Sequence, residues 1–67
     1  MKSLNELKEW FKDVHQFHLI SGIEDRESTA RYRMMVEMLK YIYPEFNKVS
    51  GSWIQESLDE YYGGIEK

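Results

Sequence analysis

Residues 31–43 are the segment that most constrains the fold. Their sequence, RYRMMVEMLKYIY, has helical periodicity, and the apolar side chains cover about 220° around the axis at about 100° per residue. An ordinary surface helix has an apolar stripe of about 100° or a little more. We therefore expect the second helix to be central, with one face in a bundle and another in an interface between molecules.

The chain has 67 residues and no cysteine, so disulfides and thiolate-bound zinc are excluded. We expect one domain, 1–67, with a small core, and domains of this size are often stabilised by oligomerisation. The net charge of −3 resides in residues 49–67, because charges cancel in the rest of the chain. An acidic carboxyl-terminal third repels nucleic-acid phosphates and favours a partner with a basic surface.

The amino-terminal sequence carries charges from Lys2 onward and has no continuous apolar core, so it does not read as a signal peptide. No segment approaches the roughly 18 apolar residues of a membrane span. We therefore expect a cytoplasmic protein that does not contact membranes. One short domain without a catalytic motif is typical of small accessory proteins of bacteria and their phages.

Helix-start and helix-stop signals divide the chain into three segments. Ser3 followed by Glu6 is a capping box, and Pro44 cannot continue the helix before it. The second helix begins within residues 22–26, where Asp25 is one candidate cap. No alternating strand pattern of useful length is present. We predict an all-α, small three-helix domain with helices at about 4–19, 24–43 and 52–62.

The predicted third helix begins at Ser52, which forms a capping box with Gln55. Gly63 and Gly64 provide its stop signal, because glycine adopts left-handed conformations at little cost. The connector before it is anchored by Phe46. In the first helix, the apolar stripe comprises Leu4, Leu7, Phe11, Val14 and His18.

No arrangement of residues indicates catalysis, a metal site or a cofactor. His15 and His18 are spaced to share a metal, but no second pair of ligands accompanies them, and His15 is predicted to face solvent. The acidic pairs fall on polar faces or at helix starts, where solvated surface is the usual role of Asp and Glu. We expect a protein that is not an enzyme and has no cofactor.

The leading hypothesis is a helical protein–protein interaction or regulatory protein, most simply a homodimer. Part of the methionine- and tyrosine-rich surface of the second helix is expected to remain exposed, and exposed apolar patches mark contacts. Tyr and Trp are favoured contact residues because they bury a large area with few rotatable bonds. The predicted partner-binding residues are Met35, Tyr41, Trp53, Tyr61 and Tyr62.

Two alternatives remain open. Arg26, Arg33 and Lys40 recur every seven residues on one face of the second helix and could contact nucleic-acid phosphates in a dimeric regulator. The predicted third helix, WIQESLDEYY, has no basic residue with which to enter a DNA groove, which makes nucleic acid the weaker reading. The other alternative is a structural subunit of a larger assembly.

Overall fold

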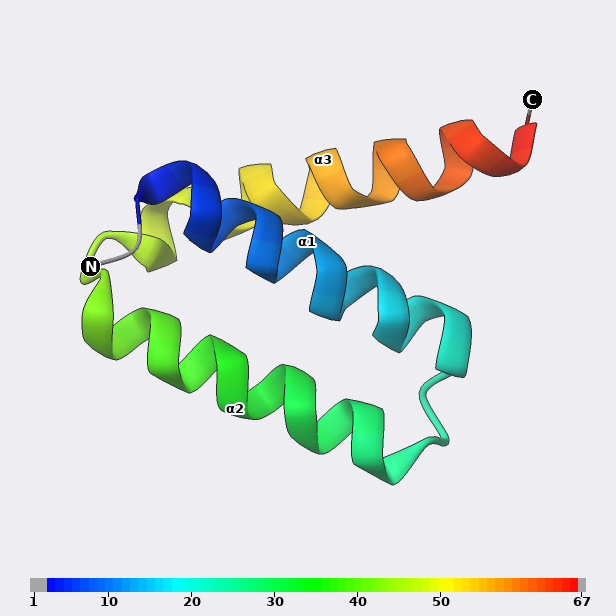
Figure 1. Cartoon of the computed structure of the whole chain (residues 1–67), viewed down its shortest axis with the longest axis horizontal. Helices are drawn as coiled ribbons and strands as arrows, with labels where there is room; N and C mark the ends of the chain where they lie inside the picture. Colours follow the sequence, from blue (N-terminus) through cyan, green and yellow to red (C-terminus); the bar gives the residue numbers. More distant parts are fainter. Residues whose placement is uncertain (1–2, 67) are drawn as a thin grey trace.

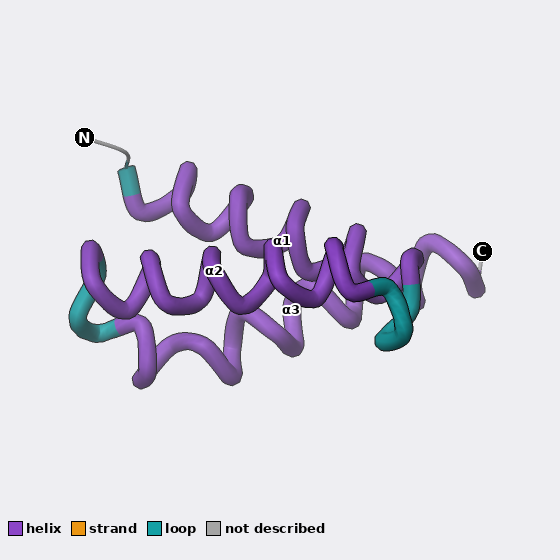
Figure 2. Tube along the Cα trace, turned by 90° about the horizontal axis from the view of Figure 1, so that it is seen from below, coloured by secondary structure: helices purple, strands orange, loops and turns teal. Residues whose placement is uncertain are grey.

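A computed structural model describes the backbone of residues 3–66 and the side chains of residues 3–63. It consists of α1 (Leu4–Ser21), α2 (Arg26–Ile42) and α3 (Phe46–Glu66), with no strand in the described residues. The prediction of a small all-α three-helix domain is confirmed. Two short loops join the helices at opposite ends of the molecule (Figure 2).

Local signals set the ends of α1. Ser3 caps the helix, because its side-chain oxygen accepts a hydrogen bond from the Glu6 backbone N–H at 3.2 Å. At the other end Gly22 has a φ of 88°, and its N–H donates to the His18 carbonyl at 3.0 Å. A positive φ is readily available to glycine, so the sequence stops the helix where the chain must turn.

Asp25, the candidate named from the sequence, is the N-cap of α2. Its carboxylate accepts a hydrogen bond from the Glu27 N–H at 3.2 Å, so the helix starts at Arg26, two residues later than predicted. The helix ends at Ile42, and the Tyr43 N–H donates to the Leu39 carbonyl at 2.8 Å. Pro44 follows directly, as expected for a residue that cannot donate to a continuing helix.

The predicted bounds of α3 are wrong at both ends. The helix starts at Phe46, six residues earlier than expected, and Ser52 lies inside it rather than at a cap. Phe46 is only 2 % exposed, so packing fixes the first turn against the core. The helical backbone also continues through Gly63 to Glu66, past the predicted stop. The connector is therefore short, and the third helix is the longest of the three.

The central helix is α1, not α2 as the sequence predicts. Figure 1 shows α1 between its two neighbours, packed against both, whereas α2 and α3 meet only near the loop that joins them. The carboxyl-terminal part of α3 extends beyond the helix pair (Figure 1). A long α3 packs along α1, and this arrangement leaves the outer side of α2 without a neighbour.

Aromatic side chains from all three helices meet in the core. Phe11 of α1 is fully buried, and its ring centroid lies 6.0 Å from Tyr32 of α2. On the other side, Phe46 and Trp53 of α3 approach the same ring at 5.7 and 5.8 Å. Tilted and edge-on arrangements of this kind are the favoured geometry for aromatic rings, and they add to the effect of burial. Leu7, Met35 and Leu39 complete the buried apolar set.

Candidate functional site

An apolar patch covers the outer side of the carboxyl-terminal half of α2. We call it the α2 patch, and it comprises Met34, Met38, Tyr41 and Ile42. Their side chains are 66 %, 48 %, 88 % and 51 % exposed, respectively. Together with Glu37 they line a shallow depression of about 270 Å³. These four large apolar side chains lie on one face of the helix and are exposed to solvent. A contact with another molecule would bury them.

The helical repeat explains why these residues lie outside the core. Ser28, Met35 and Leu39 are the buried residues of α2, and they share one face with the partly buried Tyr32. The helix α1 covers most of that face, and α3 contacts α2 only near the loop that joins them. Val36 and Tyr43 are partly buried against the core, and the remaining apolar residues of 31–43 point to solvent. The prediction that some of this broad apolar surface stays exposed is confirmed.

The five predicted contact residues do not form one surface. Met35 and Trp53 are 2 % and 5 % exposed and belong to the core, so their prediction as surface contacts is wrong. Tyr41 is fully available at the end of α2. Tyr61 and Tyr62 form an edge-on pair, with ring centroids 5.2 Å apart, near the end of α3. The ends of α2 and α3 lie at opposite sides of the molecule (Figure 1), so the tyrosines of the two helices are not brought together.

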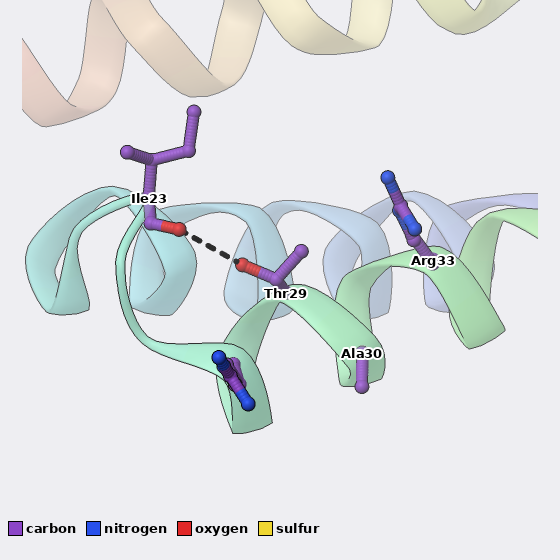
Figure 3. A pocket seen from close by; sticks show the side chains of 5 residues that line it. Ile23, Thr29, Ala30 and Arg33 are labelled. Atoms are coloured by element: carbon purple, nitrogen blue, oxygen red, sulfur yellow. Dashed lines mark hydrogen bonds between the residues drawn. The ribbon is translucent and has the colours of Figure 1, made fainter.

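Two of the predicted phosphate-binding residues do share a feature. Arg26 and Arg33 line an open depression of about 470 Å³, together with Ile23, Thr29 and Ala30 (Figure 3). Ala30 contributes only a methyl group, and the Thr29 hydroxyl donates to the Ile23 carbonyl at 3.5 Å. We call this feature the Ala30 depression. The third residue, Lys40, lies apart from it and pairs with Glu37 at 3.6 Å.

The acidic residues of α3 are largely engaged within the molecule. Glu56 forms an ion pair with Lys8 at 2.6 Å, and Glu60 forms one with Lys12 at 2.5 Å. The Glu60 carboxylate, and more weakly Glu9, raises the pKa of Lys12 against the opposing effect of burial. These pairs lie along the contact between α1 and α3. They leave the Glu56 and Glu60 carboxylates less available to a basic partner than the sequence suggests.

One buried and one partly buried histidine–serine pair escaped the sequence analysis. His15, predicted to face solvent, is only 7 % exposed, and its Nδ1 lies 2.7 Å from the hydroxyl of Ser57, which is fully buried. His18 lies with its Nδ1 3.2 Å from the hydroxyl of Ser28. The first pair joins α1 to α3, and the second joins α1 to α2. One usable signal was present: Leu7, Phe11 and His15 follow each other at four-residue spacing.

A serine hydroxyl beside a histidine is also the start of a nucleophile–base arrangement. Here the Ser57 hydroxyl is closed to solvent, and Phe11 and Tyr32 lie against the His15 ring at centroid distances of 5.7 and 5.4 Å. A substrate carbonyl has no route to that oxygen. Buried polar groups need partners, and these pairs satisfy one another. Each pair is a hydrogen bond that joins two helices.

The described residues bring together no three His, Asp or Glu side chains that could hold a metal ion. Nor does any helix in that part of the chain have both the length and the apolarity to cross a bilayer. Compared with models of protein families, with curated proteins and with solved structures, the chain matches none of them.

Proposed function

We propose that this chain is a non-enzymatic helical interaction protein that self-associates through the α2 patch. The observation that carries the proposal is the exposure of Met34, Met38, Tyr41 and Ile42 on one face of α2. Burial of apolar surface is worth about 25 cal/mol per Å² removed from water. A small three-helix domain gains stability by covering such a face.

The composition of the α2 patch supports a protein contact over a small-molecule site. The depression that it lines is shallow and open, whereas ligand sites are concave and enclose most of the ligand. Methionine side chains adapt to a partner's shape, and tyrosine supplies a large contact area with few rotatable bonds. Two of the four residues of the α2 patch are methionines, and one is a tyrosine.

Sedimentation equilibrium at high micromolar concentration tests the proposal. We expect the wild-type chain to be dimeric and the Met38→Glu variant to be a folded monomer by circular dichroism. Ile20→Glu is the matched control, because Ile20 is 70 % exposed on α1 and outside the α2 patch. This variant should remain dimeric. A monomeric wild type, or equal effects of the two substitutions, would contradict self-association through α2.

A second candidate function is nucleic-acid binding, which one observation favours: Arg26 and Arg33 line the same depression. Phosphate contacts would make binding strongly salt dependent. A titration of labelled duplex DNA from low to moderate ionic strength tests it, with Arg26→Gln and Arg33→Gln as variants. No binding at low salt eliminates this candidate.

The third candidate, a structural subunit, predicts a different assembly. The same sedimentation experiment would then reveal a large closed ring or an open polymer in place of a dimer.

A further inference from the structure

Two features of α2 match each other in shape. Tyr41, 88 % exposed, projects from the carboxyl-terminal half, and the Ala30 depression lies on the amino-terminal half. Ala30 and Tyr41 are eleven positions apart, which is about 20° of net rotation around the helix and about 16 Å along it. The projecting Tyr41 ring and the Ala30 side of the depression therefore lie on the same stripe of one helix.

A twofold axis through the middle of this stripe exchanges the two features. Ala30 and Tyr41 are equally distant from a point between Met35 and Val36. If two copies of α2 pack antiparallel about that point, each Tyr41 meets the partner's hollow. We infer that the protein forms an antiparallel α2–α2 dimer in which each Tyr41 ring seats in the Ala30 depression of a second copy, between Arg26 and Arg33. This inference rests on the proposed self-association and narrows its geometry: Met34 and Tyr41 of the α2 patch lie near the centre of the contact, and Met38 lies at its edge.

Charge favours a second copy over a uniformly basic or acidic partner. Arg33 and Glu37 are exposed on the same edge of the stripe, one turn apart. Antiparallel pairing about the same point places Glu37 beside Arg33 of the other copy, twice in the dimer. The guanidinium groups that flank the hollow also lie where they can stack on the tyrosine face, a favourable cation–π contact.

Parallel pairing lacks each of these contacts. It would set Tyr41 against Tyr41, it would leave both hollows empty, and it would place Arg33 and Glu37 of the two copies on opposite sides of the contact. The self-complementary surface that a twofold dimer needs is present only in the antiparallel register.

The absence of cysteine from the chain makes disulfide trapping a direct test. In the inferred register, the two Met34 positions are about 4.5 Å apart along the axis, and the two Ala30 positions are about 16 Å apart. A disulfide needs Cα atoms within about 7 Å. Met34→Cys should therefore form a disulfide dimer under mild oxidation, and Ala30→Cys alone should not. A mixture of Ala30→Cys and Tyr41→Cys chains should yield the mixed dimer.

Efficient disulfide formation between two Ala30→Cys chains would indicate parallel pairing and overturn the register. The register would also be overturned if the wild-type chain sediments as a dimer but the Met34→Cys variant forms no disulfide. In both cases the proposed self-association would stand. A wild type that sediments as a monomer would overturn the proposed function and the dimer geometry together.

Charge reversal is an independent test. Arg33→Glu and Glu37→Arg should each raise the dimer dissociation constant several-fold, and the double variant should recover most of the loss. Glu27→Arg is the control, because Glu27 lies on the opposite edge of the stripe, paired with Arg31 at 3.5 Å. Failure of the double variant to recover would contradict the Arg33–Glu37 pairing between copies.

Discussion

His15 illustrates how strongly the surroundings of a single residue set its chemistry. Burial, and to a lesser degree the nearby His18, lowers the pKa of His15 below its ordinary value of 6.5. The ring lies between Phe11 and Tyr32, where a positive charge loses hydration. Its bond to Ser57 can form in the neutral state with either group donating. The folded protein therefore favours the uncharged ring.

This residue predicts acid sensitivity of the fold. In the unfolded chain His15 takes up a proton near pH 6.5, whereas the folded protein resists protonation. Its contribution to the free energy of unfolding is thus complete above that pH and declines as the pH falls below it. Urea unfolding between pH 7.5 and 5 should show the decline, and His15→Gln should reduce it.

The control is His18→Gln, which should keep most of the decline because burial is the larger cause of the His15 shift. An identical pH dependence in wild type and His15→Gln would show that other groups determine the acid response.

Glycine has different effects on stability at the end of α1 and inside α3. Gly51 lies within α3, exposed, with open space around the position that a Cβ would occupy. Gly22 ends α1 with a φ of 88° and ψ of 159°, a conformation that side-chain-bearing residues avoid. Both glycines fall outside the predicted helices at about 4–19, 24–43 and 52–62, but in the structure only Gly22 lies outside a helix.

The same substitution should therefore have opposite effects in the two elements. Gly51→Ala is expected to raise the free energy of unfolding by about 0.5–1 kcal/mol, because alanine loses less backbone entropy in a helix. Gly22→Ala is expected to lower it by about 1–3 kcal/mol through backbone strain, with no clash to blame. Thermal and urea unfolding measure both. Stabilisation by both variants would mean that α1 ends in another way.

At the scale of the whole molecule, stability depends on α1 and above all on Phe11. This ring touches aromatic side chains of both other helices, so it joins two contacts that are otherwise separate. A chain of this length has a total stability of about 3–10 kcal/mol, from about 0.05–0.15 kcal/mol per residue. The loss of one such ring is comparable with the total.

Phe11→Ala should cost about 3–5 kcal/mol and leave much of the protein unfolded at 25 °C, as judged by loss of helical circular dichroism. Phe17→Ala is the matched control on the same helix. Phe17 is 48 % exposed and contacts the Arg31 guanidinium at 5.7 Å, so its loss should cost about 1 kcal/mol or less. Equal losses would contradict the central position of Phe11.

Local features of the chain were predictable, and contacts between helices were not. The caps at Ser3 and Asp25 and the stop before Pro44 depend on neighbours within four residues, and all three are present in the structure. The start of α3 was missed because burial of Phe46 extends the helix through Gly51, which propensity alone disfavours. Within the candidate site, Tyr41 was identified correctly as exposed, whereas Met35 was placed on the wrong side of its helix.

Periodicity and capping act within a few residues, so the sequence alone predicts three amphipathic helices and an excess of apolar surface on residues 31–43. Which part of that surface is exposed to solvent depends on the position of α1 between α2 and α3. Burial follows from which helix faces which, and spacing along the chain does not reveal this. That arrangement buries Met35 in the core and His15 beside Ser57, and it leaves the α2 patch exposed to solvent.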